Sequence, residues 1–225
     1  MAQLAITDFK GELELVATSS PSFDEVCEDT EQEVLRRLLG DNLYKLFSKI
    51  TEPYKTLWDG GYYYVKNSAG NYAYKYQTGL KKTLMYFVYN DFIRAQTSKA
   101  SKKGAVTFEE ANNHVLLGED LNAFLQRKYN QGVLFTKELE HFINEMNQSV
   151  EITAINGLVL STPITRLLAI GDTIEVGGTE VTVTAVEANV SITVSEVVSG
   201  NYWLKEYFED WVLNKFRPMF GGTFF

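Results

Sequence analysis

Apolar residues recur at helical spacing in two long stretches of the chain. The first stretch, at 78–96, has one apolar face formed by Leu80, Leu84, Phe87, Val88 and Phe92. The second runs from about 118 to 148 and keeps its phase across Gly132, although an interior glycine costs a helix about 1 kcal/mol. At about 1.5 Å per residue, this second helix would be roughly 45 Å long. We therefore expect two long helices.

Shorter helices are expected on both sides of this region. Ser22 and the acidic residues after it suit the N-terminal end of a helix, and Gly40 suits its C-terminal end. Asp41 is then placed to cap a second, short helix. Near the C-terminus, the aromatic segment 201–217 is expected to form a helix that stops at Pro218.

Two other segments show the patterns of β-strands. Between 60 and 76, alternating tyrosines flank the turn sequence at 67–70 and predict a β-hairpin. Residues 150–200 contain no Phe, Tyr, Trp or Lys, are rich in Val and Thr, and carry a two-residue hairpin signal at Gly177-Gly178. Strands are expected in this segment at 150–154, 157–161, 181–187 and 190–196.

Together these elements predict an α+β fold with two domains. Residues 1–149 and 201–225 would form a helical domain, a helix bundle with a small β-hairpin. Residues 150–200 would form a small β-barrel or sandwich inserted into it. The insert has six acidic residues and one arginine, a net charge of −5, which leaves −3 for the rest of the chain.

The chain as a whole is acidic, with a formal net charge of −8. A protein that binds nucleic acid on its own normally has a basic surface, so this class is disfavoured, although an acidic wall would let DNA slide past. No apolar run approaches the roughly 20 residues that cross a bilayer, and no secretory signal is expected. The single cysteine, Cys27, excludes an internal disulfide and fits a reducing cytoplasm.

No group of side chains points to catalysis or metal binding, so we expect neither an enzyme nor a cofactor. The two histidines, His114 and His141, lack metal-ligand spacing. Cys27 lies among acidic residues, which raise the pKa of a thiol, and an inert cysteine is favoured over a nucleophile.

A linker is expected at 97–107. Its lysines can contact DNA phosphates or are simply solvated, and they are Lys99, Lys102 and Lys103.

The aromatic residues near the C-terminus exceed what one helix needs. Trp203 and Trp211 are expected either to seal the core of the helical domain or to contribute to an interface. The tail after Pro218 has no core of its own, so its apolar side chains need a partner surface. The predicted interface residues are Trp203, Trp211, Arg217, Phe220, Phe224 and Phe225, with Arg217 placed to pair with an acidic group of the partner.

Four short motifs carry a family resemblance. They are Leu38–Tyr44 (LLGDNLY), Trp58–Gly61 (WDGG), Tyr76–Lys82 (YQTGLKK) and Asn214–Phe220 (NKFRPMF). In this order and spacing, the chain resembles small helical head–tail connector (adaptor) proteins of tailed phages, in particular those of phages of gut Bacteroidales, including crAss-like phages. The resemblance covers roughly 1–149 and 201–222, and the β-rich segment departs from it.

The resemblance implies a structural virion protein, assembled in the host cytoplasm, that forms a ring, usually a dodecamer, below the portal. Such a ring extends the DNA channel and receives the next tail component. The implied partners are further copies of the chain, the portal protein, and tail or further ring proteins, with no membrane. Two alternatives remain: an accessory surface or carbohydrate-binding module, and an uncharacterised enzyme. The first is disfavoured because the insert has no aromatic residue for sugar stacking.

Overall fold

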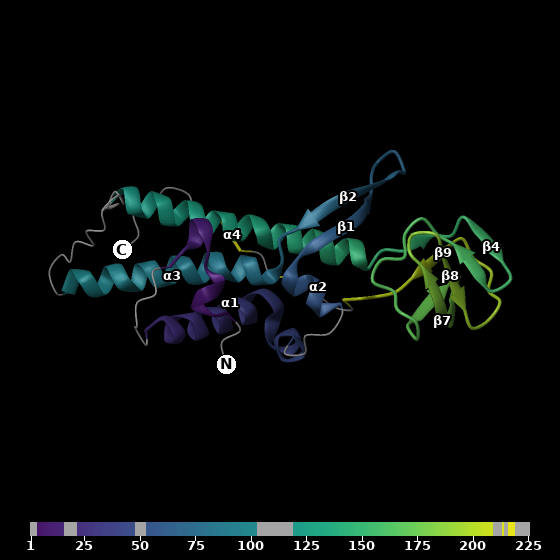
Figure 1. The fold of residues 1–225 in the computed structure, drawn as a ribbon, viewed down its shortest axis with the longest axis horizontal. Coiled ribbons are helices and arrows are strands. Elements are labelled where there is room, and N and C mark those ends of the chain that lie inside the picture. The colour runs from purple at the N-terminus through teal and green to yellow at the C-terminus, as the bar shows by residue number, and fades with distance from the viewer. Residues whose placement is uncertain are drawn as a thin grey trace. The chain divides into compact units, whose positions relative to one another are not determined.

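The computed structural model describes residues 4–15, 22–47, 53–102, 119–208, 213 and 216–218. In this part of the chain the fold is mixed α+β, with four α-helices, a two-stranded sheet and a seven-stranded antiparallel sheet (Figure 1). The chain divides into two compact units. The first comprises Met1–Ser48, Thr78–Glu138 and Leu213–Phe225, and the second comprises Lys49–Gln77 and Leu139–Val212.

The first unit contains most of the helical residues. α1 (Ser22–Leu46) includes Gly40, whose φ of 76° and ψ of 163° are not helical. Two helices therefore meet at this glycine, as predicted. α3 (Leu80–Lys102) and α4 (Glu119–Met146) confirm the two long helices, and α4 belongs to the first unit as far as Glu138. Two short 3-10 turns come first in the chain, η1 (Ile6–Asp8) and η2 (Gly11–Leu13).

α3 continues beyond the predicted start of the linker at 97–107. That prediction is wrong as far as Lys102, because these residues are helical. Residues 97–102 contain neither proline nor glycine and include an alanine and two lysines, which favour helix. Lys99 and Lys102 therefore belong to the last turns of α3.

Aromatic rings form much of the core of the first unit. The ring of Phe23 on α1 contacts Phe9 and Phe92, with centroid distances of 5.5 and 5.4 Å. Gly132 on α4 faces Phe87 on α3, and an added Cβ would come within 3.2 Å of that ring. The glycine that interrupts the apolar pattern of α4 thus allows the two helices to approach closely.

The second unit begins with α2 (Tyr54–Asp59), which ends at Gly60 with a φ of 82°. The chain then enters β1 (Gly61–Lys66), which pairs antiparallel with β2 (Tyr72–Gln77). This confirms the predicted hairpin. Its inner face packs through Tyr63 against Phe142 at the end of α4, with ring centroids 5.2 Å apart.

The other seven strands pair in the order β3-β9-β6-β7-β8-β5-β4. They are β3 (Val150–Glu151), β4 (Ala154–Asn156), β5 (Val159–Ser161), β6 (Thr173–Val176), β7 (Thr179–Glu187), β8 (Ser191–Val194) and β9 (Tyr202–Leu204). Gly177 and Gly178 join β6 to β7 with φ values of 55° and 88°, which confirms the predicted two-residue hairpin. We call residues 150–204 the β-module.

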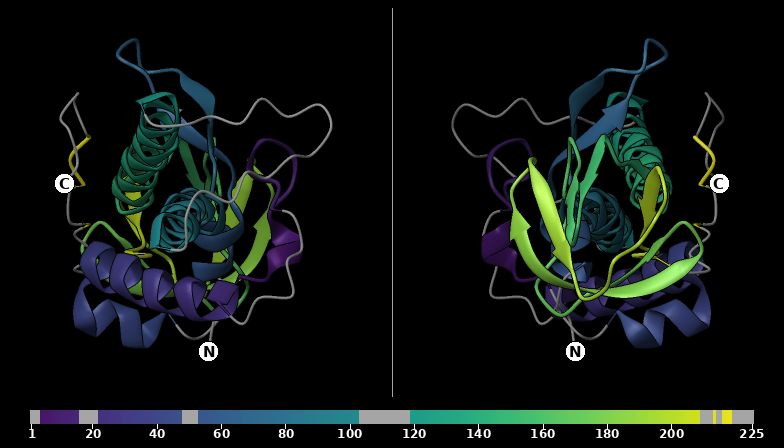
Figure 2. Two further views of the ribbon diagram at one scale, coloured as in Figure 1. Left: turned by 90° about the vertical axis from the view of Figure 1, so that its left-hand side faces the viewer. Right: turned by 90° about the vertical axis from the view of Figure 1, so that its right-hand side faces the viewer.

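β7 changes partner along its length. Its first residues pair with β6 and its later ones with β8, with an irregular register between Val183 and Ala185. Such a bulge bends a sheet, and the right-hand view of Figure 2 shows the strands curving. Within the described residues no pairing joins β3 to β4 and closes a barrel. A closed barrel or sandwich, and the insertion of 150–200 into a helical domain, stay predictions.

The predicted helix at 201–217 is wrong over the residues that the structure describes there. Residues 202–204 form β9, and 205–208, 213 and 216–218 are not helical. β9 pairs with β3, so that Trp203 lies opposite Val150. The side chain of Trp203 is completely buried, and burial of so large an apolar side chain outweighs the weak local preference for helix.

Candidate functional site

The predicted interface residues fall in different environments. Trp203 lies in the core of the β-module, where its Nε1 donates a hydrogen bond to Thr162 Oγ1 at 3.1 Å. Packing is therefore favoured over an interface for this residue. Arg217 is exposed and lies outside any helix or strand. The other predicted interface residues, Trp211, Phe220, Phe224 and Phe225, lie outside the described residues, as does Lys103 of the predicted DNA-proximal cluster.

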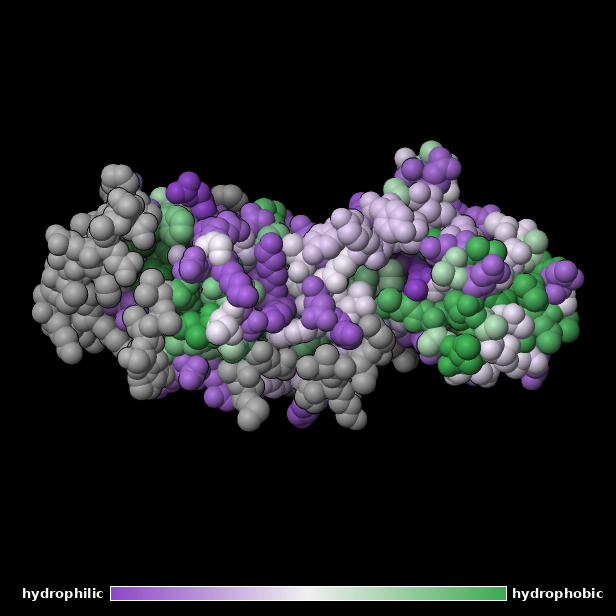
Figure 3. Space-filling model, in the orientation of Figure 1, coloured by the Kyte–Doolittle hydropathy of each residue, from purple (hydrophilic) through white to green (hydrophobic). Residues whose placement is uncertain are grey.

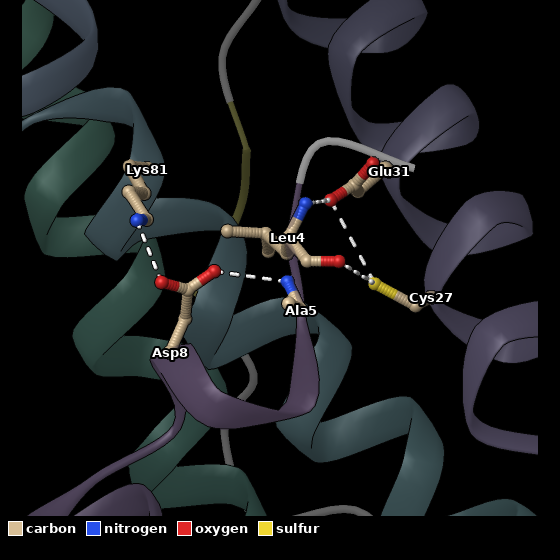
Figure 4. Close-up of polar contacts among 6 residues, drawn as sticks. All are labelled: Leu4, Ala5, Asp8, Cys27, Glu31 and Lys81. Carbon is tan, nitrogen blue, oxygen red and sulfur yellow. Dashed lines mark hydrogen bonds and ion pairs between the residues drawn. The ribbon is translucent and has the colours of Figure 1, made fainter. Parts of the chain in front are cut away.

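Cys27 is completely buried beneath the N-terminal segment (Figure 4). Its Sγ lies 3.8 Å from the carbonyl oxygen of Leu4 and 3.7 Å from Glu31 Oε1, which also accepts a hydrogen bond from Leu4 N at 2.7 Å. Burial, and then the Glu31 carboxylate, raise the pKa of the thiol to about 12. The reactive thiolate is suppressed, in line with the predicted inert cysteine.

Five tyrosines share the outer face of the hairpin. Because Tyr62 lies opposite Tyr76 and Tyr64 lies opposite Tyr74, alternation along both strands places their side chains on the same side. The ring of Tyr62 contacts those of Tyr74 and Tyr76 at centroid distances of 6.0 and 5.0 Å. We call this surface the tyrosine face: Tyr62, Tyr64, Tyr72, Tyr74 and Tyr76.

The tyrosine face is exposed at one end and covered at the other. Tyr62, Tyr74 and Tyr76 are 72%, 63% and 52% exposed, whereas Tyr64 and Tyr72 pack against the core of the β-module. Tyrosine combines a large apolar ring with a polar hydroxyl and is enriched in protein interfaces. The exposed rings are therefore a candidate binding surface.

A cleft of about 230 Å³ lies where the hairpin meets the β-module. Tyr62, Tyr64 and Tyr74 form one wall, and Arg166 and Asn189 belong to the other. The hydroxyl groups of Tyr64 and Tyr74 are hydrogen-bonded to each other, and Asn189 Nδ2 donates to Tyr64 Oη at 3.4 Å. The aromatic-free segment 150–200 thus acquires an aromatic wall from outside itself. We call this cleft the tyrosine cleft.

Arg166 and Asn189 are the two non-glycine residues with positive φ, 50° and 57°, in the described part of the chain. Arg166 has a structural reason for this strain. Its Nη1 donates hydrogen bonds to the carbonyl oxygens of Met146 and Gln148, at 2.7 and 2.6 Å, at the C-terminal end of α4. The negative end of the helix dipole stabilises a cation at this position.

A second hollow lies within the first unit, between η2, α3 and α4. It has a volume of about 520 Å³, and three aromatic rings are among the residues that line it. Three cations and one carboxylate surround it, which gives a local excess of positive charge in an acidic chain. We call it the basic groove, and its charged residues are Lys82, Arg127, Lys128 and Glu12.

Glu12 organises one end of the basic groove. Lys128 Nζ lies 2.8 Å from one of its carboxylate oxygens, and the hydroxyl of Tyr86 donates to the other. The hydrogen bond from Lys128, followed by that from Tyr86, lowers the pKa of Glu12. Lys82 and Arg127 are exposed, and neither forms an ion pair with any residue that the structure describes.

The exposed apolar side chains of the β-module are mostly aliphatic. Figure 3 shows hydrophobic residues gathered over this part of the molecule. Val197 and Ile170 are 75% and 72% exposed, and Val190 is 53% exposed. Exposed apolar groups that cluster commonly mark contact surfaces. The smaller contributors are Ile155, Leu158 and Val159.

Comparisons with protein-family models, with curated proteins and with solved structures each found no match. Within the described residues, no group of three or more His, Cys, Asp or Glu side chains is arranged to hold a metal ion. None of the described helices combines the length and apolar character that crossing a bilayer requires.

Sequence reasoning missed both the tyrosine face and the basic groove as binding surfaces. The alternation of tyrosines at 62, 64, 72, 74 and 76 was a usable signal, because period-two spacing puts all five on one side of a hairpin. The basic groove left no local signal, since Glu12, Lys82 and Lys128 lie far apart in the sequence.

Proposed function

We propose that this protein is a structural component of a tailed-phage virion that forms a ring below the portal. In this role it connects the capsid to the tail and extends the channel through which DNA passes. The protein would assemble from the host cytoplasm into the virion, with the portal and the next tail or ring component as its partners.

The observation that carries this proposal is where the motifs of the family resemblance fall in the fold. The first contains the Gly40 kink of α1. The second spans the joint between α2 and β1, and the third spans the joint between β2 and α3, where Gly79 has a φ of 87°. Of the fourth, Phe216, Arg217 and Pro218 are described. Motifs that fix joints between elements favour a shared architecture rather than a chance match of composition.

The chemistry of the surfaces supports an assembly role. The first unit carries the basic groove, and the second carries the tyrosine face and the aliphatic surface of the β-module, so the chain offers three surfaces of different character. A ring subunit needs at least two contact regions for its neighbours and one for each protein above or below it. Aromatic side chains of the kind exposed at Tyr62 and Tyr74 commonly dominate the energy of such contacts.

The proposal is tested by co-expressing the chain with the portal protein encoded in the same genome and purifying the portal. We expect stoichiometric retention and one ring of added density on the portal axis in electron micrographs. Mass spectrometry of purified virions should also detect the chain. If virions lack it and the portal never retains it, the proposal is wrong.

A second candidate function, carbohydrate binding, is favoured by one specific observation. The objection to it was that 150–200 has no aromatic residue, yet Tyr62, Tyr64 and Tyr74 form an aromatic wall of the tyrosine cleft. Flat rings beside polar groups such as Asn189 suit a sugar ring. Titration with host-surface glycans, followed by NMR, tests this: binding that is lost in Tyr74→Ala would favour it over a purely structural role.

A further inference from the structure

The basic groove is unusual in this chain because its charge opposes that of the rest. The whole protein carries −8, whereas the groove gathers three cations around one carboxylate. Lys82 and Arg127 are exposed at its rim, and aromatic rings line it: Lys82 Nζ lies 5.7 Å from the ring of Phe135. Such a hollow suits carboxylate side chains that bring an apolar stem with them.

A surface that complements the groove lies on α1 of the same unit. Glu25, Asp29 and Glu33 are spaced four residues apart, so they form a stripe along the helix. All three are exposed, and none forms an ion pair within the described residues. We call these three residues the acidic face of α1.

The two surfaces lie on different sides of the first unit. Both views in Figure 2 and the view in Figure 1 place α3 between α1 and α4. α1 packs on α3 through its buried face, which contains Cys27 and Leu38, so that its acidic face points away. The groove lies between α3 and α4. One copy therefore cannot fill its own groove, but a neighbouring copy can.

We propose that the basic groove of one copy receives the acidic face of α1 of the next copy. This contact is head-to-tail: it joins two different patches, the type of interface that builds a ring when the rotation between successive copies closes on itself. The inference rests on the proposed ring and names the surfaces that build it. Nucleic acid is the less favoured occupant, because the other surfaces of this acidic chain would repel phosphates.

Charge exchange between the two surfaces gives a sharp test. Lys82→Glu with Arg127→Glu makes the groove acidic, and Glu25→Lys with Asp29→Lys makes the face of α1 basic. Each double variant then presents like charges to itself. In sedimentation experiments at low salt we expect each to self-associate about tenfold more weakly than the unchanged protein, or worse. An equimolar mixture of the two should recover association, because each groove then meets a face of opposite sign.

Two controls separate charge effects from folding effects. Lys10→Glu with Lys137→Glu makes the same change in net charge at exposed positions of the first unit outside the groove, and it should leave association unchanged. All variants should retain the melting temperature of the unchanged protein, since every replaced side chain is exposed. Added salt should weaken association of the unchanged protein.

Several results would overturn the inference. These are an unchanged protein that stays monomeric at its highest soluble concentration, double variants that associate normally, or a mixture that fails to recover. Oligonucleotide binding that Lys82→Glu with Arg127→Glu abolishes, without effect on self-association, would assign the groove to phosphates instead. Retention on the portal is measured separately. If the chain binds the portal but charge exchange does not alter its self-association, only this contact is refuted. If charge exchange alters self-association as expected but the chain does not bind the portal, only the connector role is refuted.

Discussion

The first unit and the β-module differ in the kind of side chain that forms their cores. In the first unit, aromatic rings from distant segments meet, as Phe9, Phe23 and Phe92 do. The buried core of the β-module is built mainly from branched aliphatic residues, and almost every strand contributes to it. Trp203 is the single aromatic residue among its fully buried members.

The composition of this core also shows where the β-module ends. Its aliphatic core comes from 150–198, but the strand that completes it, β9, comes from the segment that looked like a helix. Val150 and Trp203 pair directly, so both ends of the β-module are adjacent. Deletion of 150–200 would leave Trp203 without the core that it packs in. A deletion that removes the whole β-module should therefore span 150–204.

Replacing Trp203 should produce the largest effect. Trp203→Ala removes a completely buried ring and the hydrogen bond to Thr162, and we expect the free energy of unfolding of the β-module to fall by about 3–5 kcal/mol. Trp203→Phe keeps most of the ring and should cost less. Denaturant melts followed by circular dichroism and NMR measure both. If Trp203→Ala melts like the unchanged protein, the tryptophan is not the closure of this core.

The hairpin between β6 and β7 gives a matched pair of smaller effect. Both glycines have positive φ, but a Cβ at Gly177 would clash with the carbonyl oxygen of Ser199, whereas one at Gly178 meets open space. Gly178→Ala should therefore cost about 1 kcal/mol of unfolding free energy, and Gly177→Ala clearly more. Equal costs, measured in thermal melts, would mean that the close approach of Ser199 has no energetic weight.

The thiol of Cys27 makes the stability of the first unit depend on pH. The folded pKa of about 12 lies above the unfolded value of 9.0, so the contribution of the thiol is complete below pH 9 and is lost as pH rises towards 12. At pH 8 a thiol reagent should modify Cys27 about 1,000-fold more slowly than a free cysteine, and rapidly after unfolding. Fast labelling of the native protein would contradict its burial.

The tyrosine face should show the smallest effect on stability. Tyr62→Ser with Tyr74→Ser removes two exposed rings, and we expect the free energy of unfolding to change by about 1 kcal/mol or less. Retention on the portal should fall, because exposed aromatic rings act as binding hot spots. Lys75→Ser, on the opposite side of the same strand, is the control. Unchanged retention on the portal would mean that the tyrosine face does not contribute to assembly.

The elements that could be predicted from the sequence are those whose signals are local. The helical spacing from Leu80 to Phe92, the turn at Gly177-Gly178 and the kink at Gly40 each lie within one element or one joint. β9 was missed because its identity depends on pairing with Val150, some fifty residues earlier. The basic groove was missed for the same reason, since three separate segments create it.

Size-exclusion chromatography with light scattering, of the chain alone and with its portal, tests whether the protein is a ring component that acts at the portal. We expect a defined complex whose added mass corresponds to a closed ring of copies, one per portal subunit. A mixture in which portal and chain elute separately, each at its own mass, at every salt concentration tried, would contradict it.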